Sequence, residues 1–402
     1  MDFEDSPGEA AFRAEVRAWL AANAPPKGAG SAPEPVDESE RLRRARDWQA
    51  RKAAAGYAAI TWPQAYGGRD GTRMQEVIYR QEEARFEVPT GVFDIGLGMC
   101  IPTLLAHGTE EQRRRHAGPA LRGEEIWCQL FSEPQAGSDL AGVRTRAVRA
   151  GDGWLMNGQK VWTSGARFSD FGLLLARSHP HRPKHDGLTM FILDMRASGV
   201  TVRPIRQLDG RAEFNEVFLD DVPVADADRI GLPGEGWKVA VTTLMHERLS
   251  VGGGLGLLDQ AAVLGLLRAL HPAPAEGGES RLQDRVCDWY LESRGLQLMN
   301  AQALTALSRG ATPGPEQSIA KLIAARQGQQ VGAQLMDMLD EAGQLAAAGP
   351  DDPWASVERA WTWGTAMRVA GGTDEILRTI LAERVLGLPP EPRPDKAGPF
   401  HG

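Results

Sequence analysis

Three short segments of the chain combine polar side chains with turn-forming residues, an arrangement that can bring main chain and hydroxyl groups against a ligand. They are 131–140 (FSEPQAGSDL), 157–164 (NGQKVWTS) and 370–376 (AGGTDEI). Pro134 and Gly137 allow a sharp turn in the first segment. Trp162 offers a flat wall in the second, although a tryptophan on a strand more often belongs to a core. Because each segment alone has such an ordinary explanation, their order and separation carry the information.

A carboxylate beside an arginine is the other feature that could take part in catalysis. Glu247 and Arg248 follow His246 in a helical stretch. A positioned carboxylate can act as a general base and remove a weakly acidic proton. A solvated helix face also presents such neighbours, since charged pairs are common on exposed helices. The residues alone leave both interpretations open.

Composition limits the class of protein. The 402 residues suffice for two or three domains, with 42% apolar and 24% charged residues. A net charge of −8 argues against nucleic acid or an anionic membrane as partner. The three cysteines show no CxxC spacing, and no apolar run is long enough to span a bilayer. With an acidic N-terminus (MDFED), these features predict a soluble cytoplasmic protein without disulfides, bound metal or membrane contact.

Hydrophobic periodicity divides the chain into three predicted domains and a tail. Residues 1–123 show a helical period, 124–235 show a period of two, and 236–388 are helical again, leaving 389–402 as a tail. In the first domain, Thr109 is predicted to cap a helix with Gln112 at its third position. The predicted fold class is α+β.

Strand and helix signals fill in the second and third domains. Alternation predicts a strand at 143–149, and further strands are predicted at 188–195, 200–205 and 214–219. A tight turn at Asn157–Gly158 is predicted to join 154–156 and 159–162 as a hairpin. Four long amphipathic segments predict a helix bundle, the last segment broken near Gly371–Gly372: 237–270, 280–309, 315–345 and 354–386.

In this order the segments resemble the flavin-binding core of the acyl-CoA dehydrogenase family, and the resemblance covers nearly the whole chain. It implies an N-terminal helical domain, a β-barrel-like middle domain and a C-terminal four-helix bundle. It also implies FAD as cofactor and the dehydrogenation of an acyl-CoA to the 2,3-enoyl-CoA, in fatty acid or steroid side-chain degradation. Electrons would pass to an electron-transfer flavoprotein, and the protein would be a homo-oligomer, either a dimer or a tetramer.

The resemblance assigns roles to individual residues. Trp162-Thr163-Ser164 is similar to the family's Trp-Ile-Thr, whose tryptophan flanks the flavin. The implied cofactor contacts are Gln129, Phe131, Ser132, Gly137, Ser138, Trp162, Thr163, Ser164, Arg281, Thr373 and Glu375. The implied substrate contacts are Ser138, His246, Arg248, Gly371 and Gly372.

The catalytic base is assigned through a departure from the commonest family pattern. Many members place a glutamate before a Gly-Thr pair near the C-terminus, where this chain has Gly371. A branch resembling isovaleryl- and long-chain-type dehydrogenases carries it earlier, just before an arginine. Glu247 is therefore the predicted base, with Arg248 as its electrostatic neighbour. Gly371 keeps a backbone N–H that can donate to the thioester oxygen, and its missing side chain leaves room for a branched or ring-bearing acyl group.

Two further departures concern the subunit interface. The family's Arg-x-x-Phe-Gly motif is represented only by 278–283 (GESRLQ), and its Gln-x-x-Gly-Gly-x-Gly stretch only by 339–344 (LDEAGQ). An assembly with a different partner chain, including a non-catalytic subunit of a heteromer, is therefore one alternative. A flavin oxidase or monooxygenase of the same fold is the other.

Overall fold

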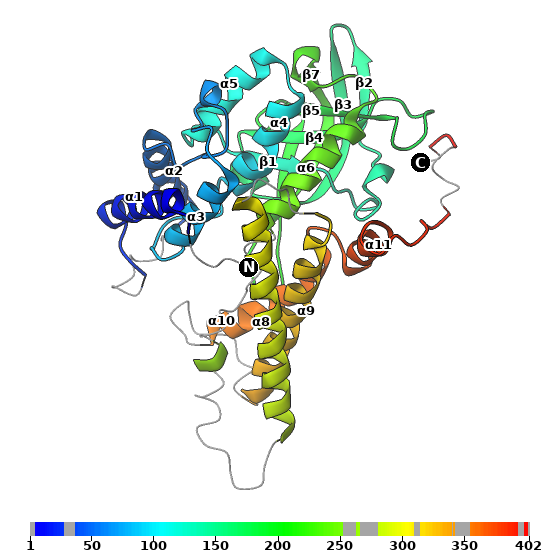
Figure 1. The fold of residues 1–402 in the computed structure, drawn as a ribbon. Coiled ribbons are helices and arrows are strands. Elements are labelled where there is room, and N and C mark those ends of the chain that lie inside the picture. Colours follow the sequence, from blue (N-terminus) through cyan, green and yellow to red (C-terminus); the bar gives the residue numbers. More distant parts are fainter. Residues whose placement is uncertain are drawn as a thin grey trace. The chain divides into compact units, whose positions relative to one another are not determined.

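The chain forms two compact units (Figure 1). One comprises residues 4–250 with 392–402, and the other comprises residues 251–391. The computed structural model describes residues 5–27, 37–251, 263–265, 280–308, 314–339, 341, 354–392 and 398–400. The side chains of 248–251, 280–283, 307–308 and 317 lie outside this description.

Helices build the N-terminal part of the first unit. Helix α1 (Pro7–Asn23) buries the apolar stripe Phe12, Val16 and Leu20, which recurs at the spacing of one helix face. The predicted cap at Thr109 is confirmed: its hydroxyl accepts from the Gln112 N–H, and the Gln112 side chain accepts from the Thr109 N–H. The other helices here are α2 (Glu38–Ala54), α3 (Arg73–Glu83), α4 (Ile101–His107) and α5 (Glu110–Leu121), with short turns η1 (Gln64–Tyr66) and η2 (Gly96–Cys100).

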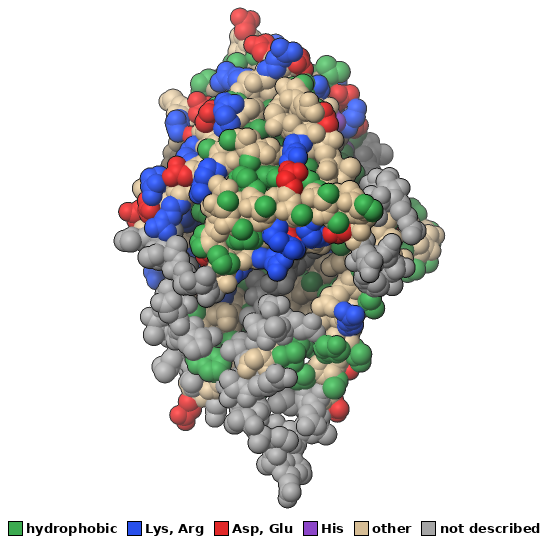
Figure 2. Space-filling view, turned by 60° about the vertical axis from the view of Figure 1, so that its left-hand side comes forward, with side chains coloured by type: hydrophobic (Ala, Val, Ile, Leu, Met, Phe, Trp, Pro, Cys, Tyr) green, Lys and Arg blue, Asp and Glu red, His purple; other side chains and the backbone are tan. Residues whose placement is uncertain are grey.

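Among the described residues, positive and negative side chains are interspersed on the surface and do not form a large patch of one sign. Arg43 of α2 pairs with Glu40 at 2.8 Å and Asp47 at 2.9 Å, at the spacings that place side chains on one helix face. Figure 2 shows Lys and Arg side chains interspersed with Asp and Glu on the face it presents. Of the described helices, none is long and apolar enough to cross a membrane.

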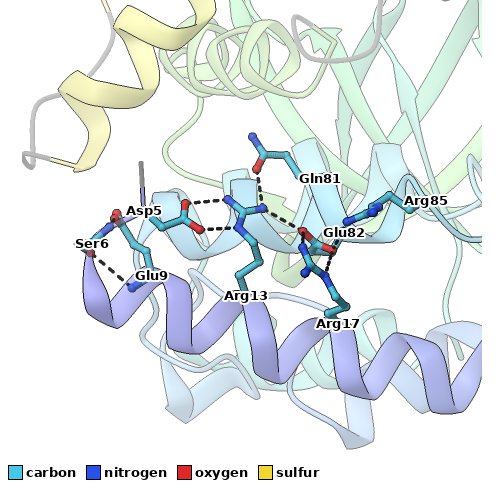
Figure 3. Close-up of polar contacts among 8 residues, drawn as sticks. All are labelled: Asp5, Ser6, Glu9, Arg13, Arg17, Gln81, Glu82 and Arg85. Atoms are coloured by element: carbon cyan, nitrogen blue, oxygen red, sulfur yellow. Dashed lines mark hydrogen bonds and ion pairs between the residues drawn. The ribbon is translucent and has the colours of Figure 1, made fainter. Parts of the chain in front are cut away.

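A buried carboxylate ties α1 to α3. Glu82 is only 3% exposed and pairs with Arg13 at 3.1 Å and Arg17 at 2.9 Å (Figure 3). Arg85, one turn further along the chain, adds a third pair at 3.2 Å. The Arg17 guanidinium holds the pKa of Glu82 at about 2, despite its burial. The carboxylate therefore stays charged at neutral pH and fixes the packing of the two helices.

An eight-stranded sheet follows in the first unit, in the order β6-β7-β3-β2-β4-β5-β8, with β1 added parallel to β4. Strand β4 is buried on both faces: Leu173 and Leu175 face one core, and Leu174 and Ala176 face the other. The strands are β1 (Trp127–Leu130), β2 (Arg146–Ala150), β3 (Gly153–Ser164), β4 (Phe171–Arg177), β5 (Leu188–Asp194), β6 (Val200–Ile205), β7 (Phe214–Ala225) and β8 (Arg229–Ile230), with short 3-10 turns η3 (Leu140–Gly142), η4 (Ala166–Phe168) and η5 (Asp226–Asp228).

The predicted hairpin at Asn157–Gly158 is wrong. Strand β3 continues through this point, and the tight turn lies at 151–152, between β2 and β3. Asn157 and Gly158 instead mark a shift in register against β7. A Cβ on Gly158 would lie 2.5 Å from the Thr145 Oγ1 and 2.7 Å from the Thr145 Cα, so the glycine is required by the close approach of another segment.

The C-terminal helices confirm the predicted break. Helix α6 (Gly236–Val251) starts the predicted third domain, but nearly all of it belongs to the first unit. In the second unit, α10 (Ala355–Val369) and α11 (Asp374–Arg384) are separated by Gly371 and Gly372, with φ of +66° and +97°, which favour glycine. They pack on α9 (Gln317–Met338) together with α8 (Ser280–Ser308).

Candidate active site

The predicted cofactor turn is held against β3 by main-chain hydrogen bonds. The Val161 N–H donates to the Ser132 carbonyl at 2.9 Å, and Glu133 and Ala136 exchange hydrogen bonds at 3.0 Å. Phe131 is buried, Ser132 is half-buried, and Gly137 and Ser138 are exposed. This geometry brings 131–138 beside the C-terminal part of β3, which carries Trp162 and Ser164. Two of the three sequence-predicted segments therefore meet.

A buried ion pair that the sequence analysis missed fixes this turn. The Lys160 ammonium donates to the Glu133 carboxylate at 2.8 Å and to the Phe131 carbonyl at 2.9 Å, and both charged side chains are at most 2% exposed. Glu133 also accepts from the Arg144 and Thr145 N–H groups, at 2.6 and 2.9 Å. The Glu133 carboxylate thus links three segments: the turn itself, residues 144–145 just before β2, and strand β3. The signal in the sequence is a lysine at an inward-facing position of β3.

Burial shifts the pKa values of this pair. It lowers the pKa of Lys160 to about 8, partly offset by the charge of Glu133. Burial alone would raise the pKa of Glu133, but the Lys160 charge and the hydrogen bonds outweigh it and hold that pKa below its usual value. Both groups are therefore charged at pH 7.

Trp162 is presented to solvent in an unusual backbone conformation. Its φ of +58° lies in the left-handed region, which costs a bulky residue free energy, and it falls within a register shift between β3 and β7. The indole is 59% exposed and meets the Phe214 ring edge-on, with centroids 5.9 Å apart. Strained backbone conformations cluster at positions that contact ligands. The strained backbone and the exposed indole of Trp162 are therefore typical of such a position.

Thr163 and Ser164 differ in burial. The Thr163 side chain is 2% exposed, and its Oγ1 has no partner among the described residues, whereas Ser164 is half-buried. Neighbouring residues of a strand face opposite sides of a sheet. Of the two predicted hydroxyl contacts, Ser164 is therefore the one available near Trp162, and Thr163 could take part only through its main chain.

Helix α6 places Glu247 next to β1. The helix is fixed to α4 by the hydrogen bond between Thr103 and Thr243 at 3.0 Å, with both threonines fully buried. Glu247 lies four residues after Thr243 and therefore on the same face of α6. The Gln129 amide of β1 donates to the Glu247 carboxylate at 3.5 Å. A predicted cofactor residue and the predicted base, 118 positions apart, are thus in contact.

His246 stands beside the predicted base with a shifted pKa. Burial lowers the pKa of His246, and the charge of Arg73 lowers it further. The imidazole is therefore neutral at pH 7 and can accept or donate a hydrogen bond without adding charge next to Glu247. The side chain of Arg248 lies outside the described residues, as do the Arg281 side chain and most of 339–344.

The second unit carries the remaining predicted residues. The Gly372 carbonyl accepts from the Lys321 ammonium at 2.7 Å, which fixes the break between α10 and α11. Thr373 caps α11 by accepting from the Ile376 N–H, and Glu375 is exposed. The left-handed backbone at Gly371 already accounts for a glycine there. Its role as a donor to substrate therefore stays a prediction.

Comparison with known proteins decides the family. The chain matches the N-terminal, middle and C-terminal domain models of acyl-CoA dehydrogenases over residues 6–124, 128–222 and 234–386. The chain belongs to the acyl-CoA dehydrogenase family. The predicted family and fold class are thereby confirmed, and the protein is an oxidoreductase that acts on acyl-CoA.

Several relatives refine this assignment. The chain is 40% identical to the acyl-CoA dehydrogenase IpdE1 of Mycobacterium tuberculosis over 392 residues, covering 94% of this chain and 98% of the relative. Among solved structures it resembles the Tcur3481–Tcur3483 steroid ACAD, with a TM-score of 0.78, 26% identity and coverage of 97% and 100%. It also resembles the ChsE4–ChsE5 complex of M. tuberculosis, with a TM-score of 0.76, 28% identity and the same coverage.

The described residues of this acyl-CoA dehydrogenase suit the flavin that its family implies. A flat aromatic heterocycle needs an apolar wall and a few directed polar groups. Trp162 and Phe214 supply an aromatic platform, and Ser132 and Ser164 supply half-buried hydroxyls on the segments around it. The buried Lys160–Glu133 pair keeps those segments in place. These are the residues that would hold the ring.

Proposed function

We propose that the protein is an FAD-dependent dehydrogenase that converts an acyl-CoA thioester to its 2,3-enoyl-CoA, with Glu247 as the base that removes the α-proton. The contact between Glu247 and Gln129 carries the proposal, because it places a carboxylate beside the strand that leads into the cofactor turn. A bound flavin supplies the oxidant for the β-hydrogen. Arg248 is the proposed electrostatic neighbour of the base, and an electron-transfer flavoprotein is the proposed electron acceptor.

Different groups of the chain are proposed to position the base, to polarise the thioester and to contact the cofactor. An α-proton beside a thioester is weakly acidic, so its removal requires a fixed base and donors aimed at the thioester oxygen. Helix α6 fixes the base through Thr243, and the neutral His246 adds no competing charge. Ser138 and the Gly371–Gly372 main chain are proposed to contact the CoA thioester. Thr373, Glu375 and Arg281 are proposed to contact the cofactor.

A ring-bearing or branched acyl group is the proposed substrate class. One similar structure is that of a steroid ACAD, and Gly371 has no side chain to occupy space beside an acyl group. A panel of acyl-CoA thioesters from short linear to steroid-type tests this. Faster flavin reduction by the ring-bearing members supports the proposed class, and a preference for short linear chains contradicts it.

Glu247→Gln tests the base. We expect the variant to keep its flavin absorbance and to lose roughly 10²- to 10⁴-fold in the rate of flavin reduction by substrate, since an amide cannot accept the proton. Glu235→Gln, the same change at an exposed position just before α6, is the control and should reduce normally. Unaltered reduction in Glu247→Gln would exclude this residue as the base.

A subunit role within a heteromer is the second candidate function. Two of the similar structures are named for pairs of chains, and the segments at 278–283 and 339–344 depart from the family pattern. Protein that is purified alone without colour, and that gains flavin only with a partner chain, would favour this role. Rapid hydrogen peroxide release from substrate-reduced enzyme in air would instead favour an oxidase.

A further inference from the structure

A cavity of about 530 Å³ opens in the sheet-bearing unit, at the end of β3 opposite to Trp162. Its walls come from β2, from the first residues of β3 at Trp154, from the end of β4 and from the η5–β8 segment. Trp154 and Trp162 are eight residues apart on β3, so the cavity lies roughly 25 Å from the proposed flavin platform. It is therefore separate from the redox site.

The cavity wall carries an excess of positive charge. Four arginines and one aspartate line it, a formal excess of three positive charges in a chain whose net charge is −8: Arg146, Arg149, Arg177, Arg229 and Asp226. Burial lowers the pKa of His179, which also lines the cavity, so this imidazole is neutral at pH 7. A concave surface of one sign concentrates ions of the other sign.

Asp226 orients two of the arginines without neutralising both. It pairs with Arg149 at 2.6 Å and with Arg229 at 3.1 Å, and it accepts from the Trp154 indole at 2.7 Å. The Arg229 guanidinium holds the pKa of Asp226 well below its usual value, so the carboxylate stays charged. The two guanidinium groups are thus held in place before any ligand arrives.

Arg177 and Arg146 provide the unbalanced charge. Arg177 is 4% exposed and donates to the carbonyls of Ala141, Val143 and Lys184, which orient the guanidinium but carry no formal charge. Burial lowers the pKa of Arg177 to about 10, so the guanidinium remains protonated. The negative charges of Glu133 and Asp139, on the side of the cofactor turn, partly offset this lowering of the pKa. Arg146 is exposed, and its side chain has no hydrogen bond or ion pair among the described residues.

We infer that this cavity binds a phosphate ester of a nucleotide. Guanidinium groups match phosphate oxygens in paired hydrogen bonds, and several fixed arginines suit a group with two or more negative charges. The volume lies in the range of small-molecule sites, which favours a nucleotide over an acidic protein surface. The phosphate could come from the nucleotide end of a CoA thioester or from a free nucleotide. Only the CoA source depends on the proposed function.

Calorimetric titration of the full-length, flavin-loaded protein with adenosine 3′,5′-bisphosphate tests the site. We expect wild type to bind it and Arg146→Glu to bind roughly tenfold or more weakly, as the loss of one charge-assisted contact predicts. Arg149→Ala should weaken binding as well. Arg206→Glu, at an exposed arginine outside the cavity, is the matched control. No binding by folded wild type up to millimolar ligand, or equal binding by wild type and Arg146→Glu, would overturn the inference.

Kinetics with two substrates then separate the sources. If the cavity holds the CoA nucleotide, Arg146→Glu raises the KM for an acyl-CoA and leaves kcat, as well as the KM for the corresponding acyl-pantetheine, unchanged. If it holds a free nucleotide, Arg146→Glu leaves both KM values unchanged while binding of the bisphosphate falls. If the protein dehydrogenates no acyl-CoA, the proposed function is contradicted. The titration still shows whether the cavity binds the nucleotide phosphate.

Discussion

Lys160 and Glu133 show how single residues hold the cofactor turn. Two opposite charges taken out of water favour folding only when both are paired and their remaining hydrogen bonds are made. Here two backbone N–H groups, one ammonium and the Gln135 amide surround a single carboxylate. The pair therefore selects one geometry for Ser132 relative to Trp162, which is what a planar ligand between them requires.

Lys160→Met removes one partner and leaves a buried carboxylate behind. We expect a loss of about 3–5 kcal/mol in the free energy of unfolding, together with weaker flavin retention, because breaking a buried pair strands the other charge. Urea denaturation and flavin absorbance after gel filtration measure the two effects. Lys184→Met breaks the pair with the 66% exposed Asp139 and should cost no more than about 1 kcal/mol. Similar losses in the two variants would contradict the assignment.

Acid should weaken the same turn. The pKa of Glu133 is lower in the folded chain than in the unfolded chain, so this carboxylate contributes stability above the unfolded value of 4.5. That contribution is lost as the pH falls through the folded pKa. The difference in unfolding free energy between wild type and Glu133→Gln should therefore be constant from pH 7 to about 5 and shrink below it. Urea denaturation at several pH values measures this, and a difference independent of pH down to 3.5 would refute it.

At the scale of elements, local signals predicted the helical regions and the strands β2, β3, β5, β6 and β7. The cap at Thr109 and the break at Gly371–Gly372 depend on neighbouring residues only, so the sequence contains them in full. Strand β4 was not predicted, although β5, which is buried on both faces in the same way, was predicted at 188–195. The Asn157–Gly158 hairpin was predicted wrongly, since a tight-turn dipeptide also suits a bulge where Thr145 approaches.

Gly158→Ala tests that explanation of the bulge. The new Cβ would meet Thr145 main chain and side chain below 3 Å, so β3 must shift, and we expect a loss of about 1–3 kcal/mol in unfolding free energy. Gly151→Ala is the control, because its φ of +55°, like the +157° of Gly158, is one that alanine rarely adopts, but no atom lies within 4 Å of the added Cβ. Thermal or urea denaturation measures both. Equal losses would mean that backbone conformation, rather than crowding, selects the glycine.

In the candidate site, the sequence could supply individual residues but not the contacts between them. Resemblance to the family supplied Gln129 and Glu247 as separate positions, but their contact depends on how α6 docks on α4 through Thr243. The pairing of Lys160 with Glu133 depends on how the 131–138 turn packs against β3. Neither could be obtained from spacing, because both arise from tertiary packing between distant segments.

At the scale of the whole molecule, part of the predicted tail 389–402 contacts the sheet-bearing unit. Residues 398–400 lie against the loop that follows β4. The Phe400 N–H donates to the Arg182 carbonyl at 3.0 Å, and the Arg177 guanidinium lies 3.7 Å from the centroid of the Phe400 ring. A cation over an aromatic face is an attractive contact, and it is stronger where water is excluded. We therefore expect residues 398–400 to help order the 178–187 loop.

Phe400→Ala removes this contact at the chain end. The interaction is worth about 0.5–2 kcal/mol, so amide hydrogen exchange in 178–187 should become roughly 2- to 30-fold faster, while exchange in α1 stays unchanged. Phe400→Leu separates the causes, because leucine keeps an apolar side chain but offers no π face to Arg177. If the cation–π contact is responsible, Leu behaves as Ala does and Phe400→Trp behaves as wild type. Unaltered exchange in Phe400→Ala would mean that the 178–187 loop is ordered without the chain end.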